Sequence, residues 1–379
     1  MSVPFLDLHA QYLALRPGLD AAMARVIEAQ RFILGPEVEG FEDEVAAYLG
    51  TPHAVGCASG TDAILLSLRA LDLPAGTPVV VPAFTFFATA GAVWNAGLRP
   101  AFADVDPETL NLTAETVEAA LTPDARAVIV VHLYGRMASM DDIVALCRSR
   151  GLVLIEDAAQ AFGAARVSNG RAVRAGAVGD LGCLSFFPTK ILGAFGDAGM
   201  VVTGDPALAE RVAKLRVHGG RQMYHHEMVG TNSRLDALQA AVLRTKLPHV
   251  DGWIDRRRGI AAAYAGALEG AGAALPAVGG GDVVNVYTVR TGRRDAVRAR
   301  LSEAGIETQV YYPVPLHLQA CFASLGHGPG DFPASERAAK TVLSLPVYPE
   351  MPAEHVDRVA AALRDAVRET GGAYADPSG

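Results

Sequence analysis

Short apolar runs alternate along most of the chain with longer segments that show helical spacing. Two segments of helical spacing, residues 13–29 and 37–49, come first and predict helices. Each short apolar run that follows predicts a strand: residues 53–57, 78–82, 100–105, 127–133, 152–155, 181–187 and 200–203. Strands that alternate with helices usually form a parallel sheet covered on both faces. The pattern therefore predicts an α/β fold with a mostly parallel seven-stranded sheet.

The pattern changes in the second half of the chain. A long helical stretch covers residues 233–270, and Pro248 is expected to kink or divide it. A glycine-rich segment, residues 269–281, then predicts a linker, and the elements expected after it cover residues 283–289 (strand), 294–304 (helix), 308–312 (strand), 334–342 (helix) and 353–368 (helix). We therefore predict a large domain, residues 1–250, and a smaller C-terminal α+β domain, residues 251–379, with a disordered tail from Gly371.

Composition and charge narrow the class of protein. Half of the 379 residues are apolar, which is enough for a large core. A net charge of −8 argues against a nucleic-acid or anionic-membrane partner, so an anionic substrate would need local arginines. The four cysteines are widely scattered and the N-terminus lacks a secretory signal pattern, so a cytoplasmic location is expected.

One uncharged run, residues 78–98, has the length of a membrane span. Pro82, Gly91, Asn95 and Gly97 interrupt it. A strand followed by a buried helix over residues 85–95 explains the run better, because glycine and proline break a long helix.

Lys190 is the first candidate for chemistry. It lies within residues 185–199, and it is the only Lys or Arg between Arg174 and Arg211. A lysine isolated among apolar segments can be a Schiff-base lysine, whose amine its surroundings keep uncharged and nucleophilic. By itself this feature leaves an ordinary lysine open.

Asp157 is the second candidate, because it ends the apolar strand at residues 152–157 together with Glu156. Ligands of open α/β sheets bind at the carboxyl ends of strands. An acid there could serve a metal, a ribose hydroxyl, a helix cap or the pyridine nitrogen of pyridoxal phosphate. The presence of Lys190 33 residues later favours the pyridine, because a carboxylate keeps that ring protonated and electron-withdrawing.

A phosphate site is predicted where the first strand leads into the helical pattern of residues 64–71. Gly60 and Thr61 would lie at the helix N-terminus, where free N–H groups and the helix dipole favour a phosphate. Simple capping of the helix by Ser59 or Thr61 is the alternative.

Several other enzyme classes find no support. His226-Glu227 lacks the second histidine of a zinc protease, and the adjacent His225 and His226 would diverge, so no metal site is expected. The chain also lacks a G-x-S-x-G elbow, a G-x-x-x-x-G-K-[ST] loop and a G-x-G-x-x-G motif after its first strand. Serine hydrolases, P-loop NTPases and dehydrogenases are therefore disfavoured.

Together these motifs resemble the sugar aminotransferases of the fold-type I pyridoxal phosphate enzymes, over nearly the whole chain. The motifs in the family's order are Gly35-Pro36, Ser59-Gly-Thr-Asp62, Pro82-Ala-Phe-Thr-Phe86, Phe102-Ala-Asp-Val-Asp106, His132-Leu-Tyr-Gly135, Glu156-Asp-Ala-Ala-Gln160, residues 185–199 and Asn232-Ser-Arg-Leu-Asp236. The resemblance implies the fold-type I transferase architecture and pyridoxal 5'-phosphate as cofactor.

The resemblance also implies roles for individual residues. Lys190 would bind the cofactor and shuttle a proton, and Asp157 would pair with the pyridinium. The other cofactor contacts would be Phe86 on the ring face, Gln160 near the ring hydroxyl, and Gly60, Thr61 and Ser185 at the phosphate. Asn232 would reach that phosphate from the neighbouring subunit of a homodimer with shared active sites. The nucleotide sugar would face Arg234, Tyr311, Tyr312 and His317.

The implied reaction transfers the amino group of L-glutamate to a keto nucleotide sugar, for polysaccharide or glycoconjugate biosynthesis. The stretch from Tyr224 to Ala241 is most similar to members that aminate carbon 3 of UDP- or dTDP-linked hexoses. Two departures are Tyr311 where 3-keto uronic acid enzymes carry His, and Ile191 where many relatives carry Asn. We expect Ile191 to tune the sugar pocket.

Three alternatives remain beside this reading. One is amination at carbon 4, and a second is a non-catalytic binding or regulatory protein on the same fold. A third, a sugar dehydratase, would replace the lysine with histidine, so Lys190 argues against it.

Overall fold

The computed structural model describes residues 2–168, 170–222 and 224–375. At its centre lies a seven-stranded sheet with the strand order β1-β9-β8-β5-β4-β2-β3. β9 runs antiparallel to β1 and β8, and the other neighbouring strands are parallel. The expected mostly parallel sheet is thus confirmed. Its strands are β1 (His53–Cys57), β2 (Pro78–Pro82), β3 (Arg99–Ala103), β4 (Ala127–Val131), β5 (Val153–Asp157), β8 (Leu181–Ser185) and β9 (Gly199–Thr203).

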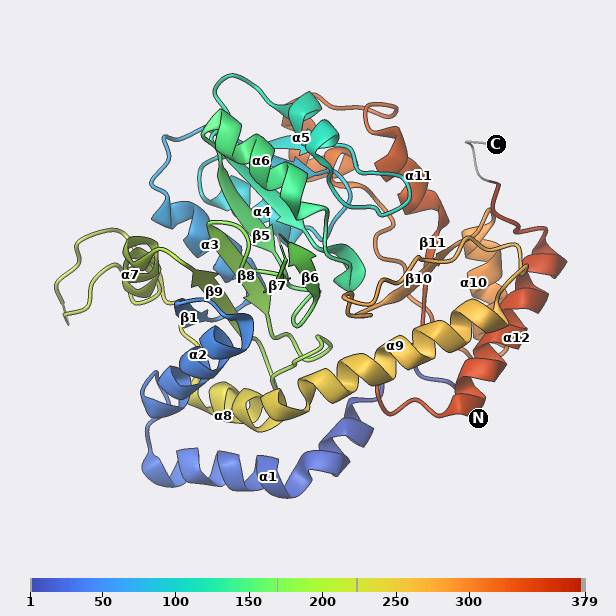
Figure 1. Cartoon of the computed structure of the whole chain (residues 1–379), viewed down its shortest axis with the longest axis horizontal. Helices are drawn as coiled ribbons and strands as arrows, with labels where there is room; N and C mark the ends of the chain where they lie inside the picture. Colours follow the sequence, from blue (N-terminus) through green and yellow to red (C-terminus); the bar gives the residue numbers. More distant parts are fainter. Residues whose placement is uncertain (1, 169, 223, 376–379) are drawn as a thin grey trace.

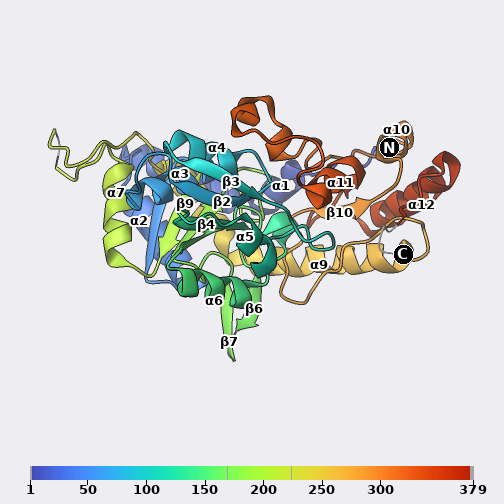
Figure 2. The same cartoon turned by 90° about the horizontal axis from the view of Figure 1, so that it is seen from above.

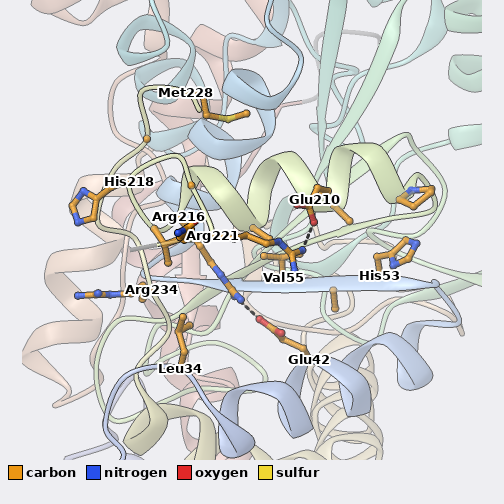
Figure 3. Close-up of a pocket in the computed structure, with 18 of the residues that line it drawn as sticks. Leu34, Glu42, His53, Val55, Glu210, Arg216, His218, Arg221, Met228 and Arg234 are labelled. Atoms are coloured by element: carbon orange, nitrogen blue, oxygen red, sulfur yellow. Dashed lines mark hydrogen bonds and ion pairs between the residues drawn. The ribbon is translucent and has the colours of Figure 1, made fainter. Parts of the chain in front are cut away.

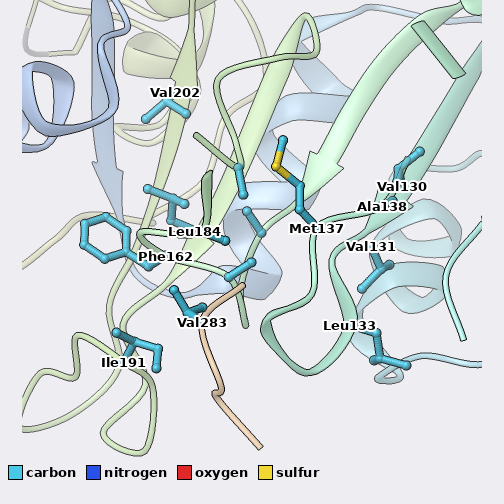
Figure 4. Close-up of a cluster of buried hydrophobic side chains, with 14 of the residues drawn as sticks. Val130, Val131, Leu133, Met137, Ala138, Phe162, Leu184, Ile191, Val202 and Val283 are labelled. Atoms are coloured by element: carbon cyan, nitrogen blue, oxygen red, sulfur yellow. The ribbon is translucent and has the colours of Figure 1, made fainter. Parts of the chain in front are cut away.

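Helices cover both faces of this sheet (Figure 1). Strand β2 shows why, since Val80 points into one apolar cluster while Val79 and Val81 point into the other. The first cluster, part of which Figure 4 shows, packs α2 (Pro36–Leu49), α5 (Ala114–Ala120), α6 (Met140–Arg150) and α8 (Ala237–Lys246) against the sheet. The second packs α3 (Gly60–Ala70), α4 (Ala88–Asn95) and α7 (Pro206–Leu215) against the opposite face.

A separate apolar cluster forms the core of the C-terminal part of the chain, which lies beside the sheet in Figure 2. It joins Val3 to residues between 260 and 367. The elements that build it are α9 (Val250–Ala267), β10 (Tyr287–Arg290), α10 (Arg294–Glu303), β11 (Val342–Leu345) and α12 (Ala353–Thr370). Helix α11 (Pro333–Thr341) packs with the first cluster instead. Strands β10 and β11 pair antiparallel. The domain boundary at residue 250 stays a prediction, although α9 begins at that residue.

Pro248 divides the long helical stretch as expected. α8 ends at Lys246, a 3₁₀ turn covers Leu247–His249, and α9 begins at Val250. Proline has no N–H to continue the helical hydrogen bonds, which accounts for the break between the two helices. The remaining helix, α1 (Leu8–Ala29), packs along α8.

Two expectations about the C-terminal part are wrong. Residues 308–312 form no strand; only Gln309 pairs, with Ser344, because Tyr311 and Tyr312 turn toward a cavity. The disorder predicted from Gly371 does not hold for residues 371–375, and residues 376–379 lie outside the described residues. The Tyr374 N–H donates to the carbonyl of Gly272, and the Gly292 N–H donates to the carbonyl of Gly372.

The sequence pattern did not predict β11, a strand of only four apolar or small residues. It also did not predict the hairpin of β6 (Ala165–Ser168) and β7 (Arg171–Arg174), because that segment lacks an apolar run. Among the described residues, no helix combines the length and low charge that crossing a membrane requires.

Candidate active site

A cavity of about 520 Å³ lies where the sheet meets the C-terminal part of the chain. The last residues of strands β4, β5 and β8 line this cavity: Val131, Asp157 and Ser185. Lys190 lines it as well, together with Gly60 and Thr61 of α3, Phe86, Gln160, Tyr311 and Tyr312. The cavity therefore occupies the position at which open α/β sheets bind ligands.

Lys190 reaches the cavity from the loop after β8. A backbone hydrogen bond of 2.9 Å from its N–H to the Phe187 carbonyl closes a turn that fixes the base of the side chain. Burial lowers the pKa of Lys190 to about 8, and the charge of Asp157 acts in the opposite direction. An amine with this pKa is partly uncharged near neutral pH, as a nucleophile or a base must be.

Asp157 lies 5% exposed at the end of β5. Its Oδ2 accepts a hydrogen bond of 2.8 Å from the Thr89 hydroxyl, and its Oδ1 accepts one of 3.2 Å from the Ala159 N–H. Burial raises the pKa of this carboxyl, against the hydrogen bond from Thr89. A cation bound next to it would therefore be held strongly, because it would relieve the cost of a buried negative charge.

Glu156 supports the same strand end from the other side. Both Glu156 and His132 are fully buried, and Glu156 Oε2 accepts a hydrogen bond of 2.8 Å from His132 Nε2. His132 Nδ1 accepts from the Ala138 N–H, so the proton of a neutral ring lies on Nε2. The N–H groups of residues 176, 178 and 179 complete the shell around the carboxylate. Glu156 thus ties the loop after β7 to the strand that carries Asp157.

We expect Glu156→Gln to destabilise the protein by about 2–4 kcal/mol, because the amide would present N–H groups to donors that now face a carboxylate oxygen. Burial alone would raise the pKa of Glu156, but His132 and the backbone donors lower it. The stabilisation is therefore present at neutral pH and is lost as the pH falls below the ordinary glutamate value of 4.5. Urea unfolding across this pH range measures both effects.

The matched control is Glu118→Gln, which removes an exposed carboxylate paired with Arg150 and should change the free energy of unfolding by about 0.5 kcal/mol or less. Equal losses for the two variants would contradict the role given to Glu156.

The N-terminus of α3 faces the cavity. Ser59 caps the helix by accepting a hydrogen bond of 3.1 Å from the Asp62 N–H. Gly60 begins the helix so close to Ser185 that an added Cβ would lie 2.6 Å from the Ser185 Cβ. This close approach requires glycine and brings the serine side chain to the first turn of α3. The cap leaves the first N–H groups of the helix available to an anion.

Gln160 and Tyr312 form a polar wall. Gln160 Nε2 donates a hydrogen bond of 2.9 Å to the Tyr312 hydroxyl, and its Oε1 accepts one of 2.7 Å from the Tyr134 N–H. Phe86 lies opposite, with its ring centroid 5.9 Å from that of Tyr312 and 54% of the residue exposed. Phe86 therefore has a free face toward the cavity.

These residues fit pyridoxal phosphate. The cavity volume lies within the range of cofactor sites. A helix N-terminus suits the phosphate, a buried carboxylate suits the pyridine nitrogen, and a lysine with a lowered pKa suits the aldehyde.

Three of the predicted site residues lie elsewhere in the single chain. Asn232 forms a bridge with Val217 outside the cavity. Arg234 lines a separate open groove between α2 and α7 (Figure 3). His317 is buried against the ring of Phe332, and a hydrogen bond of 3.2 Å joins its Nε2 to Glu336 Oε1. In a single chain these three residues therefore do not line the cavity in which the cofactor and the sugar are expected to bind.

Ile191, which we expect to tune the sugar pocket, is not among the residues that line the cavity of the single chain. Its side chain is 3% exposed and belongs to the apolar cluster shown in Figure 4. Its burial in that cluster anchors the turn that carries Lys190.

The structure also adds residues that the motifs did not indicate. Thr89, Arg257 and Asn285 contact the candidate residues or the cavity. Arg257 stands in a run of three arginines that suggests a charged surface, but it shares helical spacing with the buried Ile254, Ala261 and Tyr264. That spacing was the one signal that could have identified it.

Comparison with known proteins gives consistent results. A family model described as the DegT/DnrJ/EryC1/StrS aminotransferase family matches residues 16–364. A pleiotropic regulatory protein of Geobacillus stearothermophilus is 47% identical over 97% of this chain and 99% of its own length. A UDP-N-acetyl-3-dehydro-alpha-D-glucosamine 3-aminotransferase of Acidithiobacillus ferrooxidans is 45% identical over 96% and 97%.

A dTDP-3-amino-3,4,6-trideoxy-alpha-D-glucose transaminase of Streptomyces venezuelae is 47% identical over 96% of each chain. Among solved structures, DesV of S. venezuelae in complex with a ketimine intermediate superposes with a TM-score of 0.91 at 46% identity, covering 99% of this chain and 100% of the other.

Proposed function

The chain belongs to the DegT/DnrJ/EryC1/StrS aminotransferase family, and we propose that it transfers the amino group of L-glutamate to carbon 3 of a UDP- or dTDP-linked keto hexose. Its membership makes it a pyridoxal phosphate-dependent nucleotide-sugar aminotransferase. The observation that carries the proposal is the convergence of Lys190, Asp157 and the α3 N-terminus on one cavity. Two relatives at 45% and 47% identity, both named for an amino group at carbon 3, support the position.

When bound, pyridoxal phosphate supplies an electron sink for the carbon that bears the amino group. In this proposal Ser185 and the first turn of α3 bind its phosphate, and Asp157 holds a positive charge at the pyridine nitrogen. Phe86, which lines the same cavity, would cover one face of the ring. The surrounding apolar residues exclude water, which strengthens each of these electrostatic contacts.

Lys190 does the proton transfer in this proposal. Because its pKa is about 8, roughly a tenth of its Nζ is uncharged at pH 7, far more than for an ordinary lysine. Nζ can then accept the proton from the carbon next to the amine and deliver it within the same cavity. Asp157 raises the proton affinity of Nζ by its charge, which favours that acceptance.

A second copy of the chain would complete the site. Asn232 and Arg234 lie outside the cavity of their own chain, on the segment that follows the protruding loop after α7 in Figure 1. We propose that they serve the phosphate and the sugar of the partner's site in a homodimer. Two exposed aromatic residues that line the cavity, Phe86 and Phe187, agree with a covered surface there.

The test is the absorption spectrum of the purified enzyme after L-glutamate and then after each of several keto nucleotide sugars. L-glutamate should bleach the band of the lysine-bound cofactor, and a UDP- or dTDP-linked 3-keto sugar should restore it. Restoration by 4-keto sugars alone would move the amination to carbon 4. A protein that neither binds the cofactor nor responds to glutamate would support the regulatory alternative.

A further inference from the structure

The protruding loop after α7 is closed at its base by a short antiparallel pairing. Val217 and Asn232 form an antiparallel bridge, and the Ser233 N–H donates a hydrogen bond of 3.0 Å to the carbonyl of Arg216. These contacts hold the two ends of the loop side by side. Arg216 and Ser233 therefore belong to one structural unit, which we call the loop base.

The side chain of Ser233 ties the loop base to the first turn of α3. Ser233 is fully buried, and its hydroxyl donates a hydrogen bond of 2.7 Å to Asp62 Oδ2. The same oxygen accepts a hydrogen bond of 3.2 Å from the Ala58 N–H. Ala58 and Asp62 flank Gly60 and Thr61, which line the cavity. One hydroxyl group thus holds both ends of the turn at which the cofactor phosphate is expected to bind.

Arg216 makes a second connection from the loop base to the same part of the chain. Its Nη1 donates a hydrogen bond of 2.6 Å to the carbonyl of Gly56, on β1, and forms an ion pair with Glu42. Glu42 Oε1 also accepts a hydrogen bond of 2.8 Å from the Gly56 N–H. Both charged side chains are largely shielded from water, which strengthens their interaction. The loop base and the strand that leads into α3 are therefore held at a fixed distance.

The two neighbours of Ser233 are the residues that the single chain leaves outside its own cavity. Asn232 is exposed, and Arg234 lines the open groove of Figure 3. Under the proposed function both side chains serve the partner's site. The hydroxyl that holds the phosphate turn of one site therefore lies between two side chains that serve the other site.

We propose that Ser233 is a positioning residue for two active sites at once, that of its own chain and that of the partner. In its own chain it holds the phosphate-binding turn through Ala58 and Asp62. For the partner it holds Asn232 and Arg234 in place. This inference rests on the shared sites of the proposed function. Removing the hydroxyl should weaken cofactor binding at both sites, although the hydroxyl touches no bound group itself.

Hybrid dimers separate the two effects. Each hybrid contains one Lys190→Ala chain and one chain that keeps Lys190, so only the site of the second chain can form the lysine-bound cofactor. Titration of the cofactor-free hybrid with pyridoxal phosphate, followed by the absorption band of that bound form, therefore reports one site alone. Ser233→Ala is placed either in the chain that keeps Lys190 or in its partner. Each placement should weaken the affinity about ten-fold, as expected for a lost hydrogen bond to a charged group.

Two further variants keep the result interpretable. Ser335→Ala is the matched control, because Ser335 is also fully buried and its hydroxyl donates a hydrogen bond of 2.6 Å to Asp104 Oδ1, away from the cavity. In either chain it should leave the affinity within about two-fold. Ser233→Cys has nearly the size of serine but is a weak donor, so it should reproduce the loss if the alanine variant does not fold.

Asn232→Ala tests the premise in the same hybrids. It should weaken the reported site only when it is placed in the Lys190→Ala chain. A loss confined to the chain that keeps Lys190 would refute the shared sites of the proposed function. If Asn232→Ala acts across the dimer as proposed, a loss for Ser233→Ala in one placement only, or in neither, would overturn the double role of Ser233.

Discussion

Lys190→Ala is expected to reduce the rate of amino transfer by at least about 10⁴-fold, because the side chain serves both as the bond to the cofactor and as the base. No other described lysine lines the cavity. The rate is measured in single turnover with L-glutamate and the cofactor. Methylamine added to the variant should recover part of the lost rate, since a free amine can enter the space that the side chain leaves.

Lys246 provides the control for this variant. Burial lowers its pKa to about 8 as well, and its Nζ donates to the carbonyl of Gly193, in the loop that carries Lys190. A lowered pKa therefore does not identify the catalytic lysine. Lys246→Met should disturb the loop yet keep cofactor attachment at Lys190, measured by mass spectrometry after borohydride reduction. Attachment at Lys246, or a Lys190→Ala rate within ten-fold of wild type, would refute the assignment.

The second large effect is expected for Asp157→Asn, which should lower the turnover rate on the order of 10³-fold. Asparagine has nearly the same shape: its Oδ1 can accept the hydrogen bond from the Ala159 N–H, and its Nδ2 can donate to the Thr89 hydroxyl in place of the present bond, so the shape of the site is kept. It cannot hold a positive charge at the pyridine nitrogen, and the ring then withdraws electrons less strongly. The half-reaction with L-glutamate, followed by absorbance, gives the rate.

Thr89→Val separates charge from hydrogen bonding at the same place. The variant removes the 2.8 Å bond to Asp157 but leaves the carboxylate, so the rate should fall by about ten-fold or less. If the valine variant were as slow as the asparagine variant, the hydrogen bond and not the charge of Asp157 would be the important feature.

The sequence pattern placed the sheet well because its strands are buried on both faces. Strands β1 and β2 begin and end where the apolar runs do, and β9 differs from its run by one residue. The pattern predicted a strand wrongly where the apolar side chains of a segment pack against the cavity and not between sheet and helices. The segment at 308–312 has the composition of a strand, but its tyrosines pack against the cavity and leave one bridge.

Lys190 and Asp157 could be named as candidates from the sequence, because a lone lysine in a loop and a carboxylate at a strand end are local signals, although only the two together indicated one chemistry. Their meeting in one cavity depends on the parallel pairing of β5 with β8, which brings both strand ends to the same edge. The sequence did not show which of three consecutive arginines is buried, and only the packing of α9 identifies Arg257. It also did not show that the Ile191 side chain packs into the apolar cluster and not against the cavity. The sequence therefore determined which groups are candidates for the chemistry, since that follows from residue type and order. Only the tertiary structure decided which side chains face the substrate, since orientation depends on what each element packs against.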